Sequence, residues 1–187
     1  MICGRCGAPT LWPVERCREC AGRRLAFRTA RAAVAYTGPA RDLVAAWKEH
    51  GLRRAAIAAA DLVHEHLDPP AADVITHIPP DPSRLLVRGY HPAGRLAREL
   101  ASRWNLPSAE LLIRSGPPSA RQTGLARADR LRNTRGAFVA VAAAPRHVVL
   151  VDDVYTTGAT VSAAATALRR AGARDIDVVT FARTVRA

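Results

Sequence analysis

The chain has 187 residues, enough to bury a hydrophobic core, and its 49% hydrophobic and 24% charged composition excludes disorder along its whole length. No uninterrupted apolar run reaches about 18 residues, and the first residues form no apolar run of signal-peptide length, so we expect a soluble cytoplasmic protein without membrane insertion. The net charge of +12, carried mostly by arginine, favours partners rich in phosphate, with a merely solvated basic face as the alternative.

All the cysteines lie near the N-terminus, in two C-x-x-C pairs: Cys3 with Cys6, and Cys17 with Cys20. Two such pairs supply the four tetrahedral thiolate ligands of a structural Zn²⁺ ion. A reducing cytoplasm favours metal ligation, while two disulfides or a disordered leader are the alternatives. We therefore predict a small zinc ribbon or knuckle over residues 1–25 and a second domain over residues 26–187.

The rest of the chain alternates between strand and helix patterns. Loose alternation predicts a strand over 29–38, and helical spacing predicts helices over 40–51 and 55–67. Further along, we expect strand 73–78, helix 92–104, strands 109–113, 137–141 and 147–153, helix 159–172 and strand 175–182. Apolar strands alternating with helices predict an α/β fold, an open, mostly parallel sheet flanked by helices. Residues 27–70 would add a strand and helices to an α/β core over 71–187.

The stretch VVLVDDVYTTGAT, residues 148–160, places two adjacent acids at the end of an apolar strand and a hydroxyl-rich turn before a helix. The free amides and dipole of the helix favour a phosphate at this turn. The expected contacts are Thr156, Thr157, Gly158, Ala159 and Thr160. Asp152 and Asp153 would repel a phosphate but suit sugar hydroxyls or Mg²⁺. Phosphoribosyl pyrophosphate combines these groups, and a strand end followed by an ordinary helix cap is the alternative.

This stretch resembles the hallmark of the type I phosphoribosyltransferases, two acids followed by a T-G-x-T loop. The four-cysteine N-terminus, AVAYTGPARDLVAAWKEHG, RGYHPAGRLARELA and RQTGLARADRLRNTRGAF precede it in order. Together they make nearly the whole chain similar to the ComF family of competence-associated, phosphoribosyltransferase-like proteins. The resemblance implies a zinc-binding element on a type I phosphoribosyltransferase-like core, and a link to single-stranded DNA and DNA-uptake proteins in natural transformation.

The resemblance also implies roles for individual residues. Asp152 and Asp153 would act in catalysis by holding the ribose hydroxyls and Mg²⁺, while the loop after the first core strand, residues 78–84, would contact pyrophosphate. Arginines of the segment 119–136 would neutralise the departing diphosphate. The candidates there are Arg121, taken as catalytic, with Arg127, Arg130 and Arg132. Arg88 and Lys48 are further substrate contacts, although Lys48 is equally explained as a cation at a helix C-terminus.

Thr156 occupies the loop position where related enzymes acting on purines often carry an aspartate base, and a threonine is no base at neutral pH. Two hypotheses follow. In the first, the protein transfers phosphoribose to an acceptor that the sequence does not identify. In the second, it is catalytically silent and binds single-stranded DNA under the control of phosphoribosyl pyrophosphate. There, arginines would grip phosphates and Trp12 would stack on bases, whereas Trp47 and Trp104 are expected to be core residues.

Overall fold

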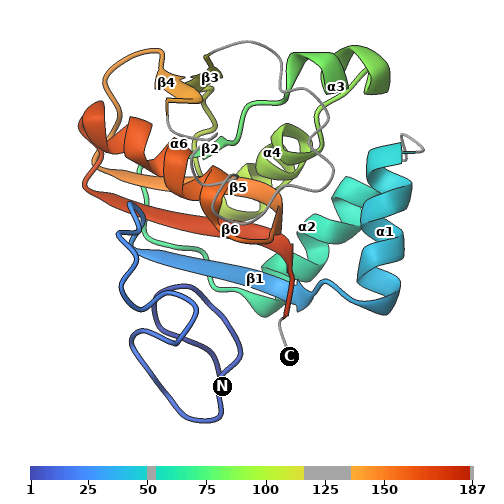
Figure 1. Cartoon of the computed structure of the whole chain (residues 1–187). Helices are drawn as coiled ribbons and strands as arrows, with labels where there is room; N and C mark the ends of the chain where they lie inside the picture. The colour runs from blue at the N-terminus through green and yellow to red at the C-terminus, as the bar shows by residue number, and fades with distance from the viewer. Residues whose placement is uncertain (50–53, 116–135, 186–187) are drawn as a thin grey trace.

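The computed structural model describes residues 1–49, 54–115 and 136–185 (Figure 1). Within these residues the centre is a parallel sheet with the strand order β1-β6-β5-β2. Its strands are β1 (Thr29–Ala35), β2 (Val74–His77), β5 (His147–Tyr155) and β6 (Asp175–Arg183). Because the strands run parallel, their carboxyl ends share one edge, which is the edge where open α/β folds bind ligands. The predicted open, mostly parallel α/β sheet is confirmed.

Helices cover both faces of the sheet (Figure 1). One face carries α1 (Gly38–Glu49), α2 (Arg54–His66) and α4 (Pro92–Trp104), and the other carries α6 (Ala159–Arg170). Successive residues of a strand point to opposite faces, so Val149 and Val151 of β5 pack with α2 and α4, while Val148 and Leu150 pack with α6. Burial on both faces explains the unbroken apolar runs in the sequence.

The strands predicted over 109–113 and 137–141 do not join this sheet. They form a separate antiparallel pair, β3 (Leu112–Arg114) with β4 (Phe138–Ala140). Just before β3, the chain runs along the free edge of β2, where Ile75 N–H donates to the Pro107 carbonyl and Ala109 N–H donates to the Ile75 carbonyl. The pair therefore sits beside the edge of the parallel sheet (Figure 1).

A short helix, α3 (Pro82–Arg88), occupies part of the segment 78–84 that the family resemblance assigns to a loop. Asp81 caps its N-terminus by accepting a hydrogen bond from the Ser83 N–H, and Pro82 fits the first turn, where no N–H is needed. Gly89 ends the helix in the left-handed conformation, with φ of 68°. These cap residues stand in the sequence and could have predicted the helix.

The N-terminal segment, residues 1–25, packs against the start of β1. Ala30 N–H donates to the Arg5 carbonyl, and the Arg31 guanidinium donates to the Gly4 carbonyl. Gly7 lies so close to the Ala30 carbonyl that a Cβ there would collide with it. Buried cysteines of the segment share one hydrophobic core with α6. In the described ranges, the helices are too short or too polar to cross a membrane.

Candidate functional site

Two adjacent carboxylates stand at the carboxyl end of β5. The preceding residues of β5, from Val148 to Val151, are buried, whereas Asp152 and Asp153 are partly exposed where the strand leaves the core. The Asp152 carboxylate accepts a hydrogen bond from the Asp153 N–H at 2.9 Å, so one of its oxygens is held against the backbone. The sequence places this acid pair at a strand end, and the structure places it at the sheet edge where open α/β folds generally bind ligands.

Lys48 reaches this acid pair from α1. Its Nζ donates to Asp153 Oδ1 at 2.7 Å, and both side chains are mostly shielded from solvent. The two residues are far apart in sequence, so only the folding of the chain brings them together. Two interpretations of Lys48 were open, a substrate contact or a cation at a helix end. The structure places Lys48 in the last turn of α1 and also in contact with the acid pair, so both remain compatible with it.

Burial and the neighbouring charge of Asp153 raise the pKa of Asp152 to about 7, against opposing effects of Lys48, the Asp153 amide and Arg114. Arg114 ends β3, and its guanidinium stacks on the Phe138 ring at 4.8 Å. It is a candidate site residue that sequence reasoning did not single out, because nothing in the local pattern shows that β3 ends near β5. In the sequence, the only indication of a role for Arg114 was its position just before the arginine-rich segment.

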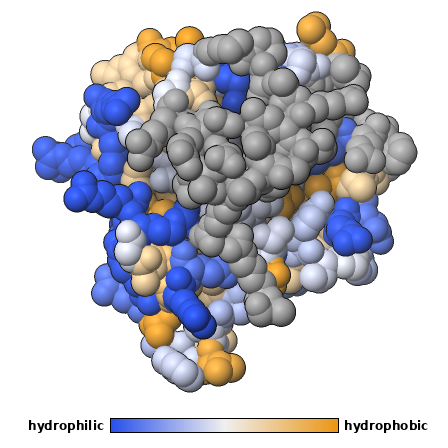
Figure 2. Space-filling view, viewed as in Figure 1, coloured by the Kyte–Doolittle hydropathy of each residue, from blue (hydrophilic) through white to orange (hydrophobic). Residues whose placement is uncertain are grey.

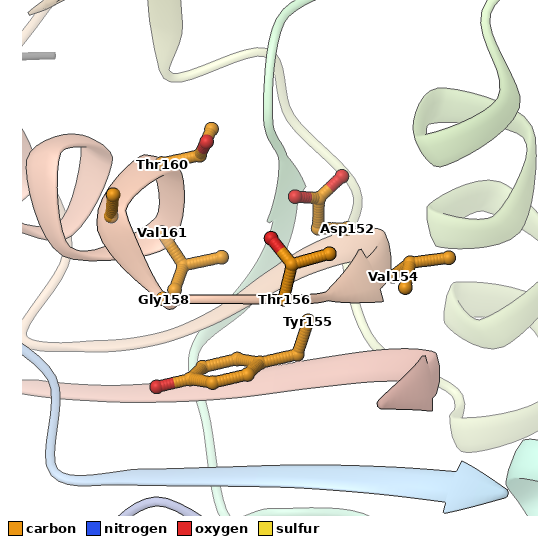
Figure 3. A pocket seen from close by; sticks show the side chains of 8 residues that line it. Asp152, Val154, Tyr155, Thr156, Gly158, Thr160 and Val161 are labelled. Atoms are coloured by element: carbon orange, nitrogen blue, oxygen red, sulfur yellow. The ribbon is translucent and has the colours of Figure 1, made fainter. Parts of the chain in front are cut away.

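The predicted phosphate loop, residues 156–160, joins β5 to α6 and borders a small open pocket (Figure 3). The pocket is lined by Asp152, Val154, Tyr155, Thr156, Gly158, Ala159, Thr160 and Val161. Gly158 has φ of 73°, a left-handed conformation that a side chain would strain. Thr157 Oγ1 accepts the Ala159 N–H at 3.3 Å, and the following amides begin α6 without intrahelical partners. The loop thus offers amides and hydroxyls beside a carboxylate.

For the remaining predicted substrate contacts, which are arginines, the described residues give no position at the pocket. Arg88 is the last residue of α3, and its side chain is outside the described part of the chain. Arg121, Arg127, Arg130 and Arg132 all lie outside the described residues. In the described ranges, the cations that act on the acid pair are therefore Lys48 and Arg114.

The cysteine cluster, formed by Cys3, Cys6, Cys17 and Cys20, gathers four sulfur atoms within 4.8 Å of one another. Neighbouring Sγ atoms are 3.5 Å (Cys6 to Cys17), 3.7 Å (Cys3 to Cys20) and 4.0 Å (Cys17 to Cys20) apart. A tetrahedral zinc with Zn–S bonds of about 2.3 Å places its sulfurs about 3.8 Å apart. Disulfide sulfurs stand at about 2.05 Å, so the four free thiols fit a metal ion and not disulfides.

The thiols of the cluster differ in acidity. Burial raises the pKa of Cys6 and of Cys20 above its ordinary value. Burial also acts to raise the pKa of Cys3, but hydrogen bonds from the backbone amides of Cys6, Arg5 and Cys17 and from the Cys20 thiol lower it to about 6. Burial disfavours the charged thiolate form of these cysteines. A bound cation would favour the thiolate form of all four and so offset this cost of burial.

Comparisons with known proteins concern the chain as a whole. It is 30% identical to "Competence protein F" of Haemophilus influenzae over 97% of this chain and 84% of that protein. It is 31% identical to "DNA utilization protein YhgH" of Salmonella typhi over 98% of this chain and 85% of the relative. No protein-family model matches the chain.

Similar solved structures overlap it in part. One is glutamine phosphoribosylpyrophosphate (PRPP) amidotransferase from B. subtilis, with a TM-score of 0.47 and 24% identity, over 68% of this chain and 26% of that one, so the chain spans about a quarter of that enzyme's length. Another is purine phosphoribosyltransferase from Pyrococcus horikoshii Ot3, with a TM-score of 0.37 and 20% identity, over 73% and 75% of the two chains. Because the sequence relatives match along nearly its whole length, the chain belongs to the ComF family of competence proteins.

Proposed function

We propose that the pocket at the end of β5 binds phosphoribosyl pyrophosphate with Mg²⁺, and that the protein is a cytoplasmic phosphoribosyltransferase acting in DNA uptake. The observation that carries the proposal is that Asp152 and Gly158 line the same pocket. An acid and an amide-rich turn at that spacing suit a ligand with vicinal hydroxyls next to a phosphate. The cysteine cluster would hold a structural Zn²⁺ ion, since all four ligand positions are supplied by protein.

Each part of the ligand has a matching group in the pocket. The amides that open α6 and the hydroxyls of Thr156, Thr157 and Thr160 would hold the 5′-phosphate. Asp152 and Asp153 would accept hydrogen bonds from the ribose hydroxyls and provide the hard oxygen donors that suit Mg²⁺. Lys48, already at 2.7 Å from Asp153, would exchange this contact for the diphosphate when the ligand brings in its own charge.

In pentosyl transfer the bond between the ribose C1 and the diphosphate oxygen breaks, and positive charge develops on the ribose ring. Carboxylates fixed beneath the ring stabilise that charge. When bound, Mg²⁺ would draw negative charge off the leaving diphosphate. Thr156 is exposed and cannot accept a proton at neutral pH, so the acceptor must arrive as a competent nucleophile.

Titration calorimetry with phosphoribosyl pyrophosphate and Mg²⁺ tests the site. Asp153→Asn should weaken binding about tenfold or more, because the neutral amide loses both the charge and an acceptor oxygen. Asp42→Asn makes the same chemical change on an exposed face of α1 and should bind like the wild type. Equal affinity of Asp153→Asn and the wild type would refute the role of the acids. Pyrophosphate release measured with a panel of bases and amines would then identify the acceptor.

The second candidate is a catalytically silent protein that binds single-stranded DNA when phosphoribosyl pyrophosphate is bound. It is favoured by Trp12, which is 64% exposed in the N-terminal segment, whereas Trp47 and Trp104 are buried as expected. Figure 2 shows hydrophobic surface at the lower end of the molecule, where this segment lies, beside hydrophilic surface. Relatives of the chain carry the name "DNA utilization protein". Exposed aromatic rings within a basic surface are typical of sites that stack bases.

Fluorescence anisotropy with a labelled oligonucleotide separates the two functions. Trp12→Ala should weaken binding about fivefold or more, because each stacked base contributes about 1–3 kcal/mol. Leu11→Ala, which removes an even more exposed apolar side chain next to it, should change little. Binding should also fall steeply with salt and rise when phosphoribosyl pyrophosphate is added. A flat salt response in the absence and presence of the ligand would refute this second function.

A further inference from the structure

A buried guanidinium connects the cysteine cluster to the end of the sheet. Arg183, the last residue of β6, is 4% exposed. Its Nη1 donates to the carbonyl of Cys6, and its Nη2 donates to Glu19 Oε2 at 2.9 Å. Both acceptors belong to the N-terminal segment, and both lie within a few residues of zinc-type ligands. The segment therefore supplies the partners that allow this charge to stay buried.

The flat face of the same guanidinium lies on Tyr155. The Arg183 Cζ atom is 4.7 Å from the centre of the Tyr155 ring, and the two residues are paired neighbours on β6 and β5. The ring also contacts Phe27, edge to face, with 6.4 Å between centres. Tyr155 is 4% exposed, so its ring is fixed between a cation and an aromatic edge.

The hydroxyl end of Tyr155 packs against Gly158 of the phosphate loop. A Cβ on Gly158 would lie 2.6 Å from Tyr155 Cζ and closer still to the hydroxyl oxygen, so the ring touches the backbone of the left-handed residue. Figure 3 shows the ring on one side of the strand and Asp152 on the other, with the turn above. The position of Gly158 sets the direction of the first amides of α6, which are the predicted phosphate contacts.

A continuous series of contacts therefore runs from Cys6 through Arg183 and Tyr155 to Gly158. We propose that Arg183 is a positioning residue that couples the occupied zinc site to the affinity of the loop for a 5′-phosphate. The coupling rests on the proposed function. When zinc is lost, the Cys6 carbonyl and Glu19 move, Arg183 loses its buried acceptors, and the Tyr155 ring no longer holds Gly158 in place. By thermodynamic reciprocity, a bound 5′-phosphate raises the affinity for zinc by the same factor.

Two probes separate this role from general stability, because they occupy different halves of the site. Ribose 5-phosphate reports on the phosphate loop, and inorganic pyrophosphate with Mg²⁺ reports on the half beyond the ribose. In the full-length, zinc-loaded protein, Arg183→Met should bind ribose 5-phosphate about tenfold more weakly, within the usual range of coupling between sites. Binding of pyrophosphate with Mg²⁺ should stay unchanged, and Arg183→Lys should recover part of the lost affinity.

Arg28→Met is the matched control. Arg28 is also an arginine whose guanidinium holds an acid of β6, Asp177, but none of its observed contacts reaches the phosphate loop. Its loss should lower stability without changing affinity for ribose 5-phosphate. Equal losses of affinity in Arg28→Met and Arg183→Met would show that affinity only follows stability and would overturn the proposal. If Arg183→Met does not fold, Tyr155→Phe removes only the hydroxyl beside Gly158 and should weaken ribose 5-phosphate binding with a full zinc content.

Zinc affinity provides the reciprocal measurement. The dissociation constant of zinc, measured at equilibrium by competition with a chromophoric chelator, should fall several-fold when the wild type is saturated with ribose 5-phosphate, and the ligand should have no such effect in Arg183→Met. A ligand that leaves the wild-type zinc affinity unchanged overturns the coupling while the proposed function stands. A wild type that binds neither ribose 5-phosphate nor phosphoribosyl pyrophosphate refutes the proposed function, and the coupling with it.

Discussion

Replacement of Asp152 by asparagine should stabilise the protein at neutral and alkaline pH. Burial, followed by the charge of Asp153, raises the pKa of Asp152 from 3.8 to about 7. About three pKa units at about 1.4 kcal/mol each make the ionised form up to about 4 kcal/mol less favourable in the folded than in the unfolded chain. Shared charge and water at the open pocket reduce this figure, so we expect a gain of about 1–3 kcal/mol for Asp152→Asn at pH 8.

The sign of the effect follows from which state binds the proton more tightly. Protonated Asp152 is favoured in the folded state, so wild-type stability should fall as the pH rises from about 4 to about 7 and then level off. Asparagine keeps the size and the acceptor oxygen for the Asp153 N–H but does not titrate. The difference between Asp152→Asn and the wild type should therefore be about a third of its full size near pH 5 and grow toward pH 8.

Urea unfolding of both proteins between pH 5 and pH 8.5 measures this difference. Protonation of the cysteine cluster affects both proteins alike and cancels when the two curves are subtracted. Asp42→Asn, on the exposed face of α1, serves as the control and should show no gain that grows with pH. Parallel curves for the wild type and Asp152→Asn would refute the reasoning, because they would mean that Asp152 titrates alike in the folded and unfolded chains.

Further predictions concern the loop, the cysteine cluster and the core. Gly158→Ala should lower the free energy of unfolding by about 2–3 kcal/mol, since the new Cβ meets Tyr155 in a left-handed residue, whereas Gly22→Ala, with φ of 71° and open space, should lose only about 1 kcal/mol. Cys17→Ser should leave the purified protein with much less than one zinc per chain by elemental analysis, and a lower melting temperature. Asp177→Ala removes the buried acceptor of a guanidinium and a hydroxyl at the start of β1, and should cost about 2–4 kcal/mol in urea unfolding.

Features encoded in contiguous residues could be predicted from the sequence. The strand, acids, turn and helix over residues 147–170 follow from one apolar run, one glycine and one helical repeat, and β5 and α6 lie there. The four cysteines are likewise predicted by their spacing, and their sulfurs do gather. The partners of β3 and β4 could not be predicted, because a short apolar run does not specify its neighbour or its direction.

Contacts between distant segments could not be predicted from the sequence for a different reason. An arginine at the end of a strand is usually exposed, so nothing local shows that Arg183 is buried against a carbonyl near the other end of the chain. Arg114 and Tyr155 were missed in the same way, since their roles depend on the charge and backbone they meet across the fold. The helix α3 was missed although its caps are local, because the resemblance had assigned that segment to a loop.

The pairing of β1 with β6 also affects how the chain matures. β1 spans residues 29–35, and its sheet partner spans residues 175–183, so the strand must wait during synthesis until nearly all the remaining residues have left the ribosome. Pairings this distant in sequence close slowly. Meanwhile the cysteine pairs emerge first and can capture metal early, before their docking surface exists. A product truncated before residue 175 would lack β6, expose the edge of β1 and lack Arg183, and would therefore be a target for chaperones and proteases.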